Sequence, residues 1–140
     1  MIHLTALLLQ PNPVIMVREP TPASPWVQSV EARCGKDLLR ISGYGAGRPA
    51  GRVAELRVNG VTVRGDAVAR LQADLSTRGA AYRLEISCGS PGQIYVRISQ
   101  GLKEEDGSLR FRFSAASIQY GRLRTYTGFQ DGAAEDFWFR

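Results

Sequence analysis

Residues 82–99 read YRLEISCGSPGQIYVRIS, in which two runs of alternating apolar and polar residues flank a Gly-Ser-Pro-Gly turn. Alternation with a period of two places every second side chain on the same face of a β-strand. The glycines and proline between the runs are typical of a tight turn. The stretch therefore predicts an antiparallel hairpin with one buried face and one solvated face.

The same alternation recurs elsewhere and in each case predicts a strand. The clearest further examples are WVQSVEARC (26–34), VAELRVN (53–59) and LRFRF (109–113). Asn59-Gly60 favours a type I′ hairpin turn, because both central residues of that turn need positive φ. We expect a mainly β protein of about seven or eight short strands, folded as an antiparallel β-sandwich or a small barrel. The architecture would be immunoglobulin-like by analogy only, because no tryptophan follows soon after the first cysteine.

One segment fits either a helix or a strand. In DAVARLQADLS (66–76), Val68, Leu71 and Leu75 share a helical face, and Asp66 is a suitable N-cap. Alternate residues of the segment are also apolar, as a strand requires. Its alanine-rich composition, poor in β-branched residues, favours a short helix near residues 66–72. Residues 73–76 could belong to either a helix or a strand.

The length of 140 residues suits one domain. We predict a single β-domain over residues 26–140, preceded over residues 1–25 by an extended N-terminal arm or the remnant of a leader. LTALLL (4–9) resembles the apolar part of a signal peptide, although no lysine or arginine precedes it. VIMV (14–17) could instead form a first strand. No stretch approaches the ~18 apolar residues that a transmembrane helix needs.

Two cysteines, Cys34 and Cys88, lie far apart in the chain and on the apolar sides of their predicted strands. This spacing favours one buried disulfide that joins facing sheets or neighbouring strands, and a disulfide implies an oxidising compartment. We therefore expect a periplasmic or secreted protein. The alternative is a cytoplasmic protein with two reduced, buried thiols.

The net charge is +5, and all basic residues except Lys36 and Lys103 are arginine. Arginine suits phosphate and carboxylate recognition, and excess positive charge attracts nucleic acid or anionic membranes. However, the chain is also rich in alanine and glycine, as codon usage in a GC-rich genome would produce. The charge by itself does not identify a partner, and nucleic acid is the less favoured one.

Residues suited to catalysis or metal binding are scarce. The only histidine is His3, near the N-terminus. The acidic stretches at 104–106 and 131–136 lack the ligand spacing of a calcium loop. We therefore predict no catalytic residue, no metal site and no cofactor, and a binding protein rather than an enzyme.

Two groups of residues are candidates for binding. The first is a face of the sheet rich in arginine, made by Arg83, Arg97, Arg110, Arg112 and Tyr95. If the strands are neighbours, these arginines would form a basic stripe for an anionic polymer or an acidic partner. Alternatively, Glu55 and Glu85 would pair with them across strands.

The second candidate is an aromatic patch formed by Tyr120, Tyr126, Phe129 and Trp138. Aromatic faces beside arginines could stack on sugars or bases. The alternative is that these rings complete the core, with the final FWFR (137–140) as a last strand.

The leading functional hypothesis is an exported β-sandwich that binds a protein, an envelope glycan or a lipid surface. A basic, nucleic-acid-associated cytosolic domain is the first alternative. The second is a secreted inhibitor or assembly subunit that docks through an edge strand or its aromatic tail.

Overall fold

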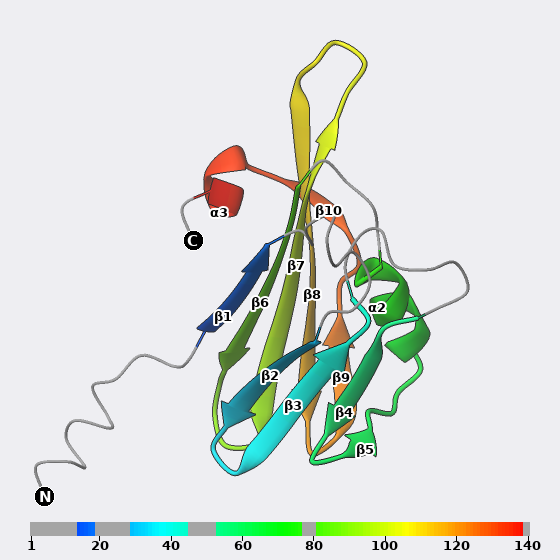
Figure 1. Ribbon diagram of the computed structural model, residues 1–140, viewed down its shortest axis with the longest axis vertical. Helices are drawn as coiled ribbons and strands as arrows, with labels where there is room; N and C mark the ends of the chain where they lie inside the picture. Colours follow the sequence, from blue (N-terminus) through cyan, green and yellow to red (C-terminus); the bar gives the residue numbers. More distant parts are fainter. Residues whose placement is uncertain (1–13, 19–28, 45–52, 77–80, 139–140) are drawn as a thin grey trace, which may run out of the picture.

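The computed structural model describes residues 14–18, 29–44, 53–76 and 81–138. In this part of the chain, a six-stranded and a four-stranded antiparallel sheet face each other as a β-sandwich (Figure 1). The described strands do not close into a barrel. The mainly β, sandwich prediction is confirmed, although the strands are more numerous than expected.

The larger sheet, sheet A, has the strand order β1-β6-β7-β8-β10, and β9 also pairs with β8. Its strands are β1 (Val14–Arg18), β6 (Ala81–Cys88), β7 (Gln93–Lys103), β8 (Leu109–Gln119), β9 (Arg122–Tyr126) and β10 (Gln130–Gly132). Sheet B has the order β2-β3-β4-β5. Its strands are β2 (Ser29–Cys34), β3 (Asp37–Ser42), β4 (Glu55–Val58) and β5 (Val61–Thr62).

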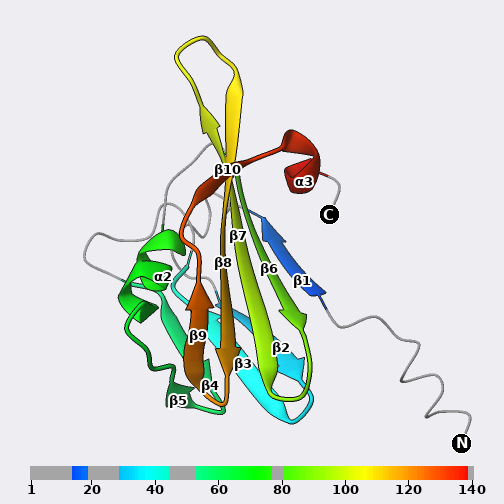
Figure 2. The same cartoon turned by 180° about the vertical axis from the view of Figure 1, so that it is seen from behind.

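The stretch 82–99 forms the predicted hairpin, with β6 and β7 paired antiparallel around the Gly-Ser-Pro-Gly turn. The expectation of short strands throughout was wrong, because β7 and β8 have 11 residues each. Residues 101–103 extend β7, where they pair with 109–111. The β7–β8 hairpin therefore projects beyond sheet B as a two-stranded arm, drawn at the top of Figures 1 and 2.

Strand β1 lies within the segment predicted as an N-terminal arm. It pairs antiparallel with β6 and forms one edge of sheet A. This agrees with the alternative in which residues 14–17 begin the sheet. The leader-like residues 4–9 lie outside the described residues.

The core lies between the two sheets and follows the predicted alternation. Leu39 and Ile41 from sheet B, and Leu84, Ile86 and Ile98 from sheet A, are completely buried. Their burial supplies the main hydrophobic stabilisation, at roughly 1.5–3 kcal/mol for each large side chain.

Helix α2 (Val68–Asp74) confirms the short helix and shows that it continues past residue 72. Its Leu71 and the following Leu75 are completely buried in the core. The expected Asp66 cap is wrong, because the N-cap residue is Ala67 and no side chain caps the helix. Asp66 instead lies in a turn that the Val68 N–H closes on the Gly65 carbonyl, at 3.3 Å.

The C-terminal segment forms a short helix, α3 (Ala134–Trp138), and not the expected strand. Phe137 is 1% exposed, and its ring centroid is 5.1 Å from that of Phe111 in β8. The Arg83 guanidinium lies 5.7 Å from the Phe137 centroid. The turn of α3 thus places Phe137 beside Phe111 and Arg83 of sheet A. Figure 2 shows α3 next to the upper part of this sheet.

The Cys34–Cys88 disulfide is present, as predicted, and joins β2 of sheet B to β6 of sheet A. Both cysteines are buried. The opposite side of the sandwich is closed by backbone hydrogen bonds: Arg64 N–H donates to the Gly121 carbonyl at 3.1 Å, and Leu123 N–H donates to the Arg64 carbonyl at 2.8 Å. The disulfide thus secures the side of the sandwich that lacks this backbone connection.

Asp74, at the end of α2, attaches the helix to sheet A. Its Oδ2 accepts hydrogen bonds from the hydroxyls of Ser114, at 2.6 Å, and Tyr126, at 2.5 Å. Burial and the neighbouring Asp74 carboxylate raise the pKa of Tyr126 from 10.0 to about 12.

Removal of the disulfide should destabilise the fold. The bridge closes a loop with a sequence separation of 54, for which chain entropy gives about 4 kcal/mol and measured values are commonly about 2–4 kcal/mol. We expect the Cys34→Ala/Cys88→Ala variant to lose an amount in this range in urea unfolding. The reduced wild-type protein serves as the matched control and should unfold at the same urea concentration. An unchanged midpoint in both would contradict the prediction.

The free energy of unfolding should fall at alkaline pH. Because the pKa of Tyr126 is higher in the folded state, its contribution is complete below pH ~10 and is lost as the pH rises through about 12. Burial also raises the pKa of Tyr44, so the comparison needs the Tyr126→Phe variant. We expect this variant to be less stable than wild type at pH 8, with the difference narrowing by pH 12. A constant difference across this range would contradict the assignment.

Candidate ligand-binding site

Four hairpin turns gather at one end of the sandwich, at the bottom of Figure 1: residues 35–36, 59–60, 89–92 and 120–121. We call this region the turn end. It contains a pocket of about 620 Å³, whose walls come from the β2–β3, β6–β7 and β8–β9 turns. Its volume falls within the range of about 300–1,000 Å³ that is usual for small-ligand sites.

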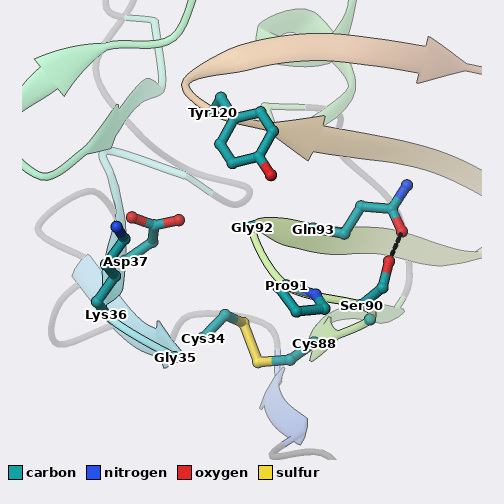
Figure 3. Close-up of a pocket in the computed structure, with 11 residues that line it drawn as sticks. Cys34, Gly35, Lys36, Asp37, Cys88, Ser90, Pro91, Gly92, Gln93 and Tyr120 are labelled. Atoms are coloured by element: carbon teal, nitrogen blue, oxygen red, sulfur yellow. Dashed lines mark hydrogen bonds between the residues drawn. A yellow bond between two sulfur atoms is a disulfide. The ribbon is translucent and has the colours of Figure 1, made fainter.

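Figure 3 shows how the pocket is built, with Tyr120 at one side and the Cys34–Cys88 disulfide at the other. A second pocket, of about 320 Å³, adjoins it. Asp37 and Tyr120 line both, and Arg64 lines the smaller one. Tyr120 therefore lies between two adjacent hollows.

Tyr120 has a backbone conformation that is unusual for a tyrosine. Among the described residues, two hairpins have two-residue turns in which both central residues have positive φ: Asn59-Gly60, at 52° and 81°, and Tyr120-Gly121, at 51° and 75°. Asparagine is favoured in such turns, whereas a bulky residue with positive φ is strained. The ring does not compensate by filling the core, because Tyr120 is 70% exposed. Backbone strain of this kind clusters at functional sites, so Tyr120 is a candidate for one.

The β6–β7 turn supports two tyrosine rings. A Cβ at Gly92 would lie 2.6 Å from Cε1 of Tyr120, so the absence of a side chain there allows the ring to approach the turn. Gly89 is similarly close to the ring of Tyr95. Gly92 also has a φ of +80°, which favours glycine independently.

Polar groups around the pocket are held by hydrogen bonds. Asn59 Nδ2 donates to Asp37 Oδ1 at 3.0 Å, and Asn59 Oδ1 accepts from the Leu38 N–H at 2.9 Å. Gln93 Oε1 accepts from Ser90 Oγ at 3.0 Å and from the Tyr95 hydroxyl at 2.8 Å. These bonds fix the orientation of the Asp37 carboxylate and the Gln93 amide before any ligand binds.

Several polar atoms at the pocket have no hydrogen-bond partner among the described residues. They are the Tyr120 hydroxyl, Asp37 Oδ2 and Lys36 Nζ. Together they offer a carboxylate acceptor, a cationic donor and a hydroxyl that can donate or accept. The Gln93 amide, in contrast, points toward Ser90 and away from Tyr120 (Figure 3). Elsewhere in the described part of the chain, no group of three or more His, Cys, Asp and Glu side chains is placed to hold a metal ion.

The predicted arginine-rich face is divided between two faces of sheet A. In the register of β7 and β8, Gln100 pairs with Arg112 and Ser99 pairs with Phe113. Since paired residues share a face, Arg110 and Arg112 lie opposite Arg83 and Arg97. The expectation that all four arginines share a face was wrong.

The same arginines are engaged in contacts within the fold. Arg83 is only 8% exposed. Arg97 lies 4.4 Å from the ring centroid of Phe113 and 3.8 Å from Glu85, as the cross-strand alternative expected. Arg112 lies 4.4 Å from the Phe129 centroid, and its Nε donates to Gln100 at 2.7 Å. Arg110 pairs with Glu104 at 3.1 Å, on the arm.

The predicted aromatic patch is also dispersed. Tyr120 lies at the turn end, whereas Tyr126 lies at the other end of β9, bonded to Asp74. Phe129 packs against the core beneath Arg112. The side chain of Trp138 lies outside the described part of the structure.

Three pocket residues, Lys36, Asp37 and Gln93, were not among the predicted site residues. Asp37 and Gln93 are the first residues of β3 and β7, and Lys36 directly precedes β3, but their gathering at one end depends on the stacking of the two sheets. A sequence signal did exist for Tyr120, because Tyr-Gly occupies the centre of a hairpin turn where Asn-Gly is favoured.

No protein-family model, curated protein or solved structure shows significant similarity to the chain. Within the described residues, no helix is both long and apolar enough to cross a membrane.

Replacement of Tyr120 tests whether its ring serves stability or binding. Because asparagine tolerates positive φ, we expect Tyr120→Asn to raise the free energy of unfolding by about 0.5–1 kcal/mol. The measurement is urea unfolding beside wild type. A loss of more than about 1 kcal/mol would show that the ring stabilises the fold and would remove the argument for a functional role.

Proposed function

We propose that this protein is an exported, disulfide-linked β-sandwich that binds a ligand at the turn end, in the pocket beside Tyr120. The observation that carries the proposal is the strained backbone of an exposed tyrosine, with φ at 51°, at the edge of a pocket of about 620 Å³. A residue that is unfavourable for the turn and exposed to solvent is best explained by contact with a ligand.

The buried disulfide supports an extracytoplasmic location, periplasmic or secreted. Disulfides persist in oxidising compartments and are rare in the cytosol. The Cys34–Cys88 bridge joins the two sheets, which makes it a structural bond of the fold. Such a bond would be of most use where thiols are not kept reduced.

The other candidate functions receive less support. Nucleic-acid binding would need clustered cations, but the arginines of sheet A lie on opposite faces, and Arg97 and Arg110 pair with glutamates. An assembly subunit that docks through its aromatic tail would need a free tail. Phe137 of that tail is instead buried on the protein's own sheet.

Sedimentation with washed envelopes from the cells that produce the protein tests the binding role. We expect wild type to sediment with the envelopes and Tyr120→Asn to remain in the supernatant. Leu109→Asn is the matched control, because it removes another exposed apolar side chain, 43% exposed, from β8 near the tip of the arm. Absence of wild-type binding, or equal binding by Tyr120→Asn, would overturn the proposal.

The location is tested separately by mass spectrometry of the protein from its own cells after thiol alkylation. An oxidised, exported protein should gain two alkyl groups only after reduction and should be recovered outside the cytosol. Free alkylation of both cysteines without reductant would contradict export.

A further inference from the structure

We infer that the ligand of the turn end is an uncharged carbohydrate, with a pyranose ring stacked on Tyr120 and its hydroxyls bonded to Asp37 and Lys36. This inference rests on the proposed binding function and names its ligand class.

The exposed ring of Tyr120 provides the first argument. A pyranose ring with equatorial hydroxyls has apolar C–H faces, which bury well against an aromatic ring. Tyr120 is held close to Gly92 and is 70% exposed. The ring is therefore positioned by the turn, while most of its surface is open to a ligand.

The mixture of polar atoms provides the second argument. Sugar hydroxyls each donate and accept, so a sugar site needs both kinds of partner close to the stacking ring. Asp37 Oδ2 offers an acceptor and Lys36 Nζ a donor in the lining of the larger pocket, and the Asp37 carboxylate is already oriented by Asn59. Pre-oriented groups lose little conformational entropy when a ligand binds.

The charges of the pocket favour a neutral ligand. The charged side chains that line the larger pocket are Lys36 and Asp37, which have opposite signs. Arg64 lines only the smaller pocket. A nucleic acid or an anionic lipid surface requires an excess of cations at the contact, and the larger pocket has no such excess.

The backbone around the pocket makes a peptide a poorer fit. An extended peptide commonly binds by adding a strand to a free sheet edge. The walls of the pocket are instead the β2–β3, β6–β7 and β8–β9 turns. A compact ligand recognised by side chains is the better match to this end of the sandwich.

The test uses envelopes of the producing cells that have been digested with protease and extracted with organic solvent, so that polysaccharide remains. We expect wild type to bind this remaining polysaccharide as it binds untreated envelopes. Binding should change little between about 50 and 500 mM salt. Binding of wild type to untreated envelopes, but not to the digested or extracted material, would show a protein or lipid ligand. That result would overturn the carbohydrate inference and leave the proposed function standing.

A steep loss of binding with salt would overturn the uncharged character of the ligand. Absence of Tyr120-dependent binding to untreated envelopes would instead remove the proposed function itself. The two failures are therefore distinguishable.

Binding by variants of the protein then tests where the sugar binds. The soluble probe is a mixture of oligosaccharides released from the remaining polysaccharide by partial acid hydrolysis. Passage through an anion exchanger and a cation exchanger leaves only the uncharged ones. We expect Tyr120→Asn and Asp37→Asn each to weaken binding about tenfold, whereas Tyr120→Phe, which keeps the ring, weakens it about threefold or less. Asp37→Asn retains an acceptor for Asn59 and should keep the wild-type stability. Leu109→Asn should bind as wild type does. Equal binding by Tyr120→Asn and wild type would overturn the assignment.

Discussion

The Cys34–Cys88 disulfide is the constraint on which both the sandwich and its candidate site depend. On one side of the sandwich, the chain passes from sheet B to sheet A with backbone hydrogen bonds between Arg64 and β9. On the other side, β2 ends sheet B, and the disulfide ties it to β6. Each cysteine is the last residue of its strand, directly before a turn that lines the pocket. The bond that holds the sheets together therefore also sets the separation of two pocket walls.

The two type I′-like hairpin turns differ in how well their residues suit the backbone. At Asn59-Gly60 the sequence agrees with its backbone, and the Asn59 side chain also orients Asp37. At Tyr120-Gly121 the local preference is violated by an exposed aromatic residue. Local violations that the surrounding structure sustains are expected at functional sites. Both turns are short connections between paired strands. The pairing of β8 with β9 therefore holds Tyr120 in its strained conformation.

The arginines show why net charge is a poor guide to the partner of this protein. Three guanidinium groups lie over phenylalanine rings, at Phe113, Phe129 and Phe137. Cation–π contacts of this kind contribute about 0.5–2 kcal/mol each. Much of the positive charge thus has a structural role.

The sequence by itself determined the fold class, most of the strands, the short helix and the disulfide, because alternation, turn residues and cysteine placement are local signals. Only the tertiary structure decided which face each arginine occupies. LRFRF alternates equally well in either phase, and the pairing of β8 with β7 places Arg112 beside Gln100 rather than beside Arg97. The aromatic tail became a helix because Phe137 could then cover Phe111. The pocket joins Lys36, Gln93 and Tyr120 from distant turns, and no local pattern records which turns will meet when two sheets stack.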